Sequence, residues 1–328
     1  METRRMERLG LETSVIGMGC WQIGGSWGEV GQDDALATLH AAADAGVTFF
    51  DTADVYGDGR SEQLVGRFVK QRPAGSVVVA TKMGRRADPH EASAYTLDAF
   101  RRWIDRSREN LDVAVLDLVQ LHCPPSEVFA SPQVFEALET LVAEGRIRAY
   151  GVSVERCDEA LTALEHPGLA SIQIIVNAFR HKPLERVLPA AAEAGVGVIA
   201  RVPLASGLLS GRYDADTTFA ADDHRSFNRH GEQFDRGETF SGVPYDVGVA
   251  AAQEFSALAP EGVTPAQFAL RWLVDTPGVS VVIPGARNPE QARANAAAGS
   301  LAPVTDAQRA AVAALYEERI AEHVHASW

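Results

Sequence analysis

The sequence has few cysteines, and their positions fit neither a disulfide framework nor a zinc site. Cys20, Cys123 and Cys157 are the only three in 328 residues, and no two of them have CxxC spacing. An odd number this small excludes the disulfide-rich class of small secreted domains and favours a reducing compartment. Cys123 adjoins His122, but the sequence supplies no third ligand in a metal-binding pattern, so we predict no metal.

Blocks of positive charge and long apolar runs are also missing. Lysine and arginine number 30 against 44 acidic residues, which gives a formal net charge of −14. Without a basic cluster, nucleic acid and anionic membranes are poor partners, so we expect a small-molecule partner instead. No segment approaches the roughly 20 apolar residues of a membrane span, and no signal peptide is recognisable, so we expect a cytoplasmic protein. The sequence gives no indication of the oligomeric state.

Internal repeats and low-complexity tracts are lacking too, and a regular alternation runs through the chain instead. Apolar, β-branched runs alternate with segments of helical spacing. Eight such runs predict strands, at Val15–Cys20, Val47–Asp51, Ser76–Thr81, Leu116–Leu121, Ala149–Val152, Ile172–Val176, Val196–Ala200 and Val279–Ile283. Because these strands are apolar throughout rather than alternating, the sheet is expected to be covered on both faces. The pattern predicts an α/β protein, a (β/α)8 TIM barrel forming one domain over residues 1–328.

The alternation stops between the seventh and eighth strands. The stretch Arg212–Pro244 is rich in Asp, Gly, Arg and His, and its four phenylalanines favour packing over disorder. We expect a loop insertion at about residues 206–244, which would act as a lid or binding loop. This loop and the shorter one at Gly84–Glu91 are expected to decide the substrate.

The two ends of the chain carry additional elements. Leu9–Val15 has the pattern of a short hairpin leading into the first barrel strand. Residues 305–322 are predicted to form a closing helix, because Thr305 and Gln308 make a capping box.

Polar side chains stand where three successive predicted strands end. Asp51, Lys82 and His122 occupy these positions, and Tyr56 follows in the loop after the first of them. Parallel strands of a barrel end at the same face, so these side chains should meet there. A tyrosine is a weak acid, and a nearby lysine cation favours its deprotonated form, so we expect Lys82 to lower the pKa of Tyr56. A buried ion pair and a structural histidine are the alternatives for these residues.

The last predicted strand leads into a second polar cluster, which has the pattern of an anion-binding site. A glycine turn at Gly285 is followed by Asn288 as N-cap and Pro289 as the first helical residue. A helix start presents free N–H groups, and Arg287 adds a guanidinium suited to phosphate. The dinucleotide fingerprint GxGxxG is absent, so a nucleotide would not be held as in a Rossmann fold. An ordinary capped helix beside a surface arginine is the alternative.

As a set, the motifs at these positions resemble those of the aldo-keto reductase family, over nearly the whole chain. They are Asp51-Thr52-Ala53-Asp54-Val55-Tyr56-Gly57, Thr81-Lys82, Gln120-Leu121-His122, Gly151-Val152-Ser153 and Ile283-Pro284-Gly285. The resemblance implies a (β/α)8 barrel that transfers hydride from NADPH to an aldehyde or ketone. It also implies that Tyr56 is the general acid, that Lys82 and Asp51 tune it, and that His122 positions the carbonyl group.

The resemblance further implies a set of cofactor-binding residues. These are Gly19, Trp21, Ser153, Gln173, Arg201, Ser206, Leu208, Ser210, Gly285, Arg287, Gln291 and Asn295. Ser153 and Gln173 match positions that hold the nicotinamide carboxamide, and the last three match those around the adenosine 2′-phosphate and adenine.

The chain departs from the family's pattern at two of the positions around the cofactor. Val154 replaces the usual asparagine, and Arg201 replaces an aromatic residue that stacks on the nicotinamide. Because a guanidinium disfavours a positively charged ring, Arg201 is expected to weaken NADP+ relative to NADPH.

The predicted substrate pocket consists of Trp21, Trp27, Tyr56 and His122, since flat rigid rings suit a small carbonyl compound.

Two other functions stay open. Lys82 at the end of a barrel strand could instead form a Schiff base with the substrate, which would make the protein an aldolase. The resemblance equally allows a cofactor-sensing regulatory subunit with low turnover.

Overall fold

The computed structural model describes residues 1–25, 30–221 and 223–328, and its centre is a sheet of eight parallel strands. The strands are β3 (Met18–Gly19), β4 (Phe49–Asp51), β5 (Val78–Met83), β6 (Leu116–His122), β7 (Ile147–Ser153), β8 (Ser171–Ile175), β9 (Gly197–Arg201) and β10 (Val281–Val282). They are hydrogen-bonded in sequence order, and parallel bridges from Ile16 to Val282 and from Gly19 to Gly285 join the first to the last. Each predicted strand overlaps one of these eight, so the predicted barrel is confirmed.

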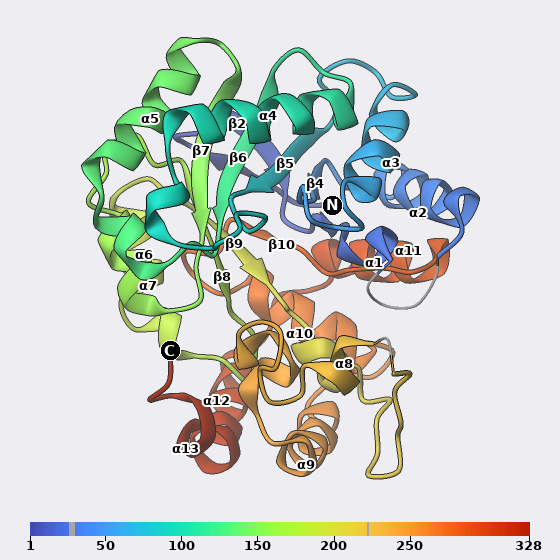
Figure 1. Cartoon of the computed structure of the whole chain (residues 1–328). Coiled ribbons are helices and arrows are strands. Elements are labelled where there is room, and N and C mark those ends of the chain that lie inside the picture. Colours follow the sequence, from blue (N-terminus) through green and yellow to red (C-terminus); the bar gives the residue numbers. More distant parts are fainter. Residues whose placement is uncertain (26–29, 222) are drawn as a thin grey trace.

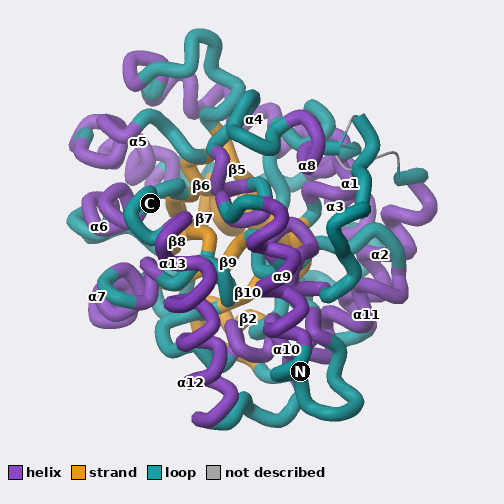
Figure 2. Tube along the Cα trace, turned by 90° about the horizontal axis from the view of Figure 1, so that it is seen from below, coloured by secondary structure: helices purple, strands orange, loops and turns teal. Residues whose placement is uncertain are grey.

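Helices surround the strands, as Figure 2 shows in a view that places the strands at the centre. The helices between successive strands, with α11 after the last, are α1 (Trp21–Gly24), α2 (Gln32–Asp44), α3 (Arg60–Val69), α4 (Leu97–Leu111), α5 (Pro132–Ala143), α6 (Cys157–Ala163), α7 (Val187–Glu193), α8 (His224–Phe227), α9 (Tyr245–Ser256), α10 (Pro265–Val274) and α11 (Pro289–Ala297). Local sequence fixes several of their ends. Thr264 and Gln267 form a capping box at α10, and the Asn288 side chain accepts from the Gln291 N–H at α11.

The N-terminal hairpin lies earlier in the chain than predicted. Strand β1 (Thr3–Met6) pairs antiparallel with β2 (Leu11–Ser14), so Leu9–Val15 covers only the end of the turn and the second strand. The first strand was missed because its TRRM sequence has no apolar alternation. Met6 and Leu9 are buried against inward-facing residues of the barrel such as Phe49 and Leu118. The hairpin therefore plugs the barrel at the end where the strands begin.

The segment between β9 and α10 lies at one end of the barrel, drawn in yellow to orange at the bottom of Figure 1. Before α9, its described residues contain α8 and short 3-10 turns, including those at Ala205–Ser210, Arg236–Glu238 and Phe240–Gly242. Its aromatic rings pack on one another, since Phe219 contacts Tyr213 at 5.3 Å and Phe240 at 5.8 Å between ring centroids. This packing gives the segment a defined shape.

The C-terminal segment packs against this part of the chain. Helix α12 (Asp306–Leu315) starts at the predicted capping box and continues through a π-helical turn at Tyr316–Ile320 into α13 (Ala321–Val324). Trp328 then packs on the 235–242 segment, where its Nε1 donates to Asp235 at 2.9 Å. In the part of the chain that the structure describes, no helix combines the length and apolarity needed to cross a membrane.

Candidate active site

The structure brings Asp51, Tyr56, Lys82 and His122 together where β4, β5 and β6 end. Asp51 and His122 are the last residues of β4 and β6, and Lys82 is the last but one of β5. Lys82 donates to the Asp51 carboxylate and, at 2.8 Å, to the Thr52 carbonyl oxygen. Its Nζ also lies 3.4 Å from the Tyr56 hydroxyl oxygen. Lys82 is thus the centre of the group.

Asp51 and Lys82 form a fully buried ion pair whose remaining hydrogen-bonding capacity is used. The second Asp51 oxygen accepts from Gln173 at 2.8 Å and from Gln120 at 3.1 Å. Although burial acts in the opposite direction, the Asp51 carboxylate raises the pKa of Lys82. Such pairing is what a buried charge requires, so the ammonium stays charged.

Burial, rather than Lys82, dominates the pKa of Tyr56. Burial raises this pKa above that of a free tyrosine, and the lowering by the Lys82 cation is the smaller effect. The prediction that Lys82 gives a net lowering is therefore wrong for this structure, because the hydroxyl is removed from water. Tyr56 is consequently a neutral phenol at neutral pH, the form that a proton donor needs.

His122 is neutral and has an unexpected neighbour. Burial lowers its pKa well below that of a free imidazole, and Arg85, Lys82 and Arg201 act in the same direction. Its Nε2 lies 3.3 Å from Arg85 Nη1. A guanidinium can only donate, so Nε2 accepts. The other ring nitrogen, Nδ1, is buried and has no hydrogen-bond partner in the described part of the chain.

A cavity of about 780 Å³ extends from these residues to the start of α11. Eleven of the twelve residues predicted to bind the cofactor line it: Gly19, Trp21, Ser153, Gln173, Arg201, Ser206, Ser210, Gly285, Arg287, Gln291 and Asn295. Leu208 is the exception. Its side chain is fully buried and points toward Gly248 of α9, so it belongs to the core and not to the cavity wall. Trp27 lies outside the described residues.

The far end of the cavity has the geometry of an anion site. The start of α11 is preorganised, since Gln291 accepts from the Arg287 N–H at 2.9 Å and Asn295 donates to the Gly285 carbonyl at 3.0 Å. The Arg287 side chain is exposed, and its guanidinium makes no hydrogen bond to any residue that the structure describes. It is therefore available to a ligand.

Some predicted cofactor residues also have structural tasks. A Cβ at Gly285 would lie 2.0 Å from the end of the Gln22 side chain, so a larger residue there would have to displace Gln22. The Ser206 hydroxyl accepts from the Phe240 N–H at 3.0 Å and donates to the Glu238 carbonyl at 3.1 Å. Ser206 thereby fixes the segment that carries Glu238.

Arg201 lies in a cluster of buried charges rather than alone beside the cavity. It donates to Glu155 at 2.7 Å and to the Val154 carbonyl at 3.1 Å, while Glu238 pairs with Arg85 at 3.2 Å. Burial raises the pKa of Glu155, whereas the two arginines overcome burial and lower the pKa of Glu238. Of the two carboxyl groups, Glu155 is therefore the one that holds a proton more readily.

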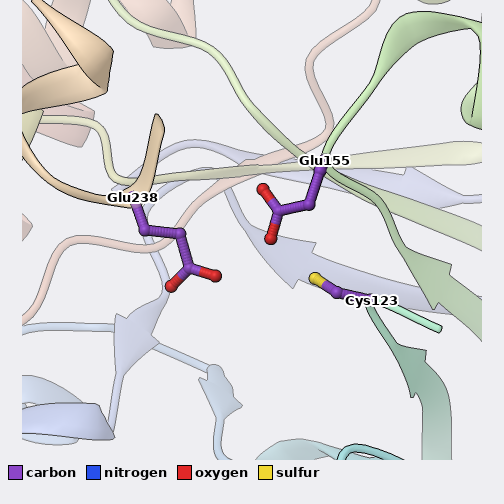
Figure 3. Close-up of side chains that lie close together, drawn as sticks. All are labelled: Cys123, Glu155 and Glu238. Carbon is purple, nitrogen blue, oxygen red and sulfur yellow. The ribbon is translucent and has the colours of Figure 1, made fainter. Parts of the chain in front are cut away.

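The thiol of Cys123 adjoins these two carboxyl groups, and the three ligand-type atoms lie within 4.8 Å of one another. Figure 3 shows the carboxyl groups of Glu155 and Glu238 facing each other near the sulfur. Burial raises the pKa of the Cys123 thiol, which opposes the thiolate form that binds metals. Because guanidinium groups already hold both glutamates, we interpret the cluster as an ion-pair network.

Phe234 and Arg85, which the sequence did not single out, lie close to the site. The Trp21 ring stacks on Tyr56 with centroids 6.0 Å apart and contacts Phe234 at 5.9 Å. Arg85 and Phe234 lie in the two loops predicted to decide the substrate, but no pattern distinguished them from their neighbours. Only the folded loops show which side chains face inward.

Comparisons with known proteins agree with this geometry. The model of the aldo/keto reductase family matches residues 15–317. The aldo-keto reductase YhdN of Bacillus subtilis is 31% identical over 299 residues, covering 90% of this chain and 87% of the relative. The structure of the glycerol dehydrogenase AKR11B4 from Gluconobacter oxydans is 31% identical with a TM-score of 0.78, covering 98% of this chain and 96% of that chain. An aldo/keto reductase from Klebsiella pneumoniae in complex with NADP and acetate is 25% identical with a TM-score of 0.69, covering 94% and 93%.

Proposed function

Because this chain belongs to the aldo/keto reductase family of NAD(P)H-dependent oxidoreductases, we propose that it transfers hydride from NADPH to a small aldehyde or ketone and forms the alcohol. The observation that carries the proposal is the placement of Tyr56, with its hydroxyl 3.4 Å from the Lys82 ammonium at one end of a long cavity. An available arginine stands at the other end.

The residues along the cavity suit NADPH. Arg287, Gln291 and Asn295 would hold the adenosine 2′-phosphate end, where a guanidinium and a helix start favour an anion. Ser153 and Gln173 would hold the nicotinamide end, next to Tyr56. The similar Klebsiella pneumoniae protein was solved with NADP, which supports this assignment. When bound, NADPH supplies the hydride.

Residues of the chain then supply the proton that the carbonyl oxygen takes up. Neutral Tyr56 donates its proton to the carbonyl oxygen, and the Lys82 cation stabilises the tyrosinate that forms. Asp51 keeps Lys82 charged throughout. His122 is neutral and lies beside Tyr56, with ring centroids 5.9 Å apart, where it can orient the substrate oxygen.

The aldolase alternative is disfavoured by the surroundings of Lys82. A Schiff base needs a free neutral amine. Here the three donors of the ammonium face Asp51, the Thr52 carbonyl and Tyr56, and the residue is fully buried. The same arrangement suits an electrostatic role.

The reaction is tested with an activated aldehyde. We expect the purified protein to oxidise NADPH in the presence of 4-nitrobenzaldehyde, as measured by the loss of NADPH absorbance. Borohydride trapping of a carbonyl compound on Lys82, with no NADPH oxidation by any aldehyde or ketone, would establish the aldolase instead.

We further propose a cytoplasmic location. The small number of cysteines supports it, and all three are free thiols in the structure.

A further inference from the structure

We propose that Arg85 selects the substrate, and that it favours carbonyl compounds with a carboxylate close to the carbonyl carbon, such as 2-oxo acids. The inference rests on the proposed reduction and adds a substrate class to it.

The geometry of the Arg85 side chain supports this role. Its Nη1 atom lies 3.3 Å from His122 Nε2 and 3.2 Å from a Glu238 oxygen, so one nitrogen makes both contacts. Its Nη2 and Nε atoms make no hydrogen bond within the described residues and are not among the buried atoms. The side chain is 25% exposed. Two adjacent N–H donors of a guanidinium match the two oxygens of a carboxylate.

The charge around His122 also favours an anion. Three cationic groups act on the His122 ring, namely Arg85, Lys82 and Arg201. Asp51 compensates Lys82. Arg85 and Arg201 face Glu238 and Glu155, and burial favours the protonated form of Glu155. With Glu155 protonated, one of the two guanidinium charges has no carboxylate partner, and burying a charge is favourable only with a partner of opposite sign.

The short distance between Arg85 and His122 sets the kind of acid. If His122 binds the carbonyl oxygen, the carboxylate lies only one or a few bonds away. Beyond it, the flat Trp21 ring lines the cavity. Phe234 contacts Trp21, and the Arg85 guanidinium carbon lies 5.7 Å from the centroid of the Phe234 ring. Benzoylformate, an aromatic 2-oxo acid, is therefore a suitable probe.

The test compares benzoylformate with its methyl ester in the protein and in two variants. Because the ester is intrinsically more reactive, the informative quantity is the change in the acid-to-ester ratio of kcat/KM. Arg85→Gln is expected to lower this ratio roughly 10- to 100-fold, the usual range for charge-assisted hydrogen bonds. Arg86→Gln is the matched control, because the neighbouring Arg86 pairs with Asp54 and Asp58 instead of His122. It should leave the ratio unchanged.

An unchanged ratio in Arg85→Gln, or an equal loss in Arg86→Gln, would overturn the proposal. If Arg85→Gln lowers kcat/KM as much for uncharged D-glyceraldehyde as for benzoylformate, Arg85 binds hydroxyl groups rather than a carboxylate. That result would also overturn the proposal. Calorimetric binding of benzoylformate to the protein with NADP+ gives a readout independent of turnover, and Arg85→Gln should abolish it. If 4-nitrobenzaldehyde is not reduced at all, the proposed function fails, while this binding difference still decides the role of Arg85.

Discussion

At the scale of single residues, the dependence of Tyr56 on Lys82 is the most direct test of the mechanism. Tyr56→Phe keeps the ring and removes the hydroxyl, so kcat should fall at least roughly 10²-fold with little change in NADPH binding. Lys82→Met should also lower kcat, because burial, Asp51 and Glu238 all raise the pKa of Tyr56 and would then oppose tyrosinate formation without the Lys82 cation. The measurements are kcat with one good aldehyde and NADPH affinity by fluorescence.

The double variant separates two explanations of this pair. If both substitutions disable one unit, Tyr56→Phe with Lys82→Met should be little worse than Tyr56→Phe alone. Multiplicative losses would mean that Lys82 acts by another route, and near-normal turnover in Tyr56→Phe would remove Tyr56 from the mechanism.

Cofactor choice depends on a second residue, Arg287. Arg287→Ala should raise the KM for NADPH by one or two orders of magnitude, because a charge-assisted contact contributes about 1.5 to 3 kcal/mol. The KM for NADH should hardly change, since NADH lacks the 2′-phosphate. Arg293→Ala is a matched control, as Arg293 is exposed on α11, the helix that follows Arg287, but does not line the cavity. An equal rise in KM for both cofactors would show that Arg287 does not bind the 2′-phosphate.

At the scale of elements, a partly buried histidine, His181, connects the loop after β8 to α10 and the π-helical turn. The His181 ring stacks on Trp272 at 5.1 Å and on Tyr316 at 4.0 Å between centroids. Burial lowers the pKa of His181 to about 3, and its Nε2 has no hydrogen-bond partner among the described residues. The native protein therefore keeps this ring neutral.

Stability should depend on pH through this residue. Between the unfolded pKa near roughly 6.5 and the native value of about 3, only the unfolded chain binds the proton, so stability is lost as pH falls. From pH 7.5 to pH 5 the loss is about 2 kcal/mol. His181→Phe keeps the stacking and should remove this part of the pH dependence in urea unfolding. Exposed His230→Phe is the control, and an identical pH dependence in His181→Phe and the unmodified protein would contradict the explanation.

The elements that the sequence predicts well are those with strong local signals. The eight barrel strands are nearly continuous apolar runs, and α10, α11 and α12 begin at side-chain caps that are confirmed. Strand β1 has no such signal, because two of its four residues are arginines. Helix α6 has only seven residues and was not predicted.

The same distinction applies to the site. Asp51, Lys82 and His122 could be grouped because barrel geometry brings successive strand ends together. Arg85, Glu155 and Glu238 could not, since their contacts depend on how three loops fold over the strands. The raised pKa of Tyr56 was also missed, because burial of a hydroxyl follows from packing and not from the sequence around it.

At the scale of the whole molecule, the hairpin and the site lie at opposite ends of the barrel. Met6 is almost fully buried, and its methyl group lies 2.4 Å from the position that a Cβ at Gly197 would take. Met6→Ala should lower the free energy of unfolding by about 2 to 5 kcal/mol through the cavity it leaves. The kcat/KM at 25 °C should stay unchanged, since Met6 packs with Phe49 and Leu118 at the end of the barrel away from the active site. A comparable fall in kcat/KM would show that the two ends are coupled.

The plug at the closed end has a consequence for how such a protein can change over generations. Mutations in the loops at the open end mostly cost stability, and a protein tolerates them only while it stays above the threshold for folding. The hairpin residues packed inside the barrel add stability above this threshold, and they lie away from the substrate. Lineages that keep the plug can therefore exchange loop residues such as Arg85 and acquire new substrates without first losing the barrel.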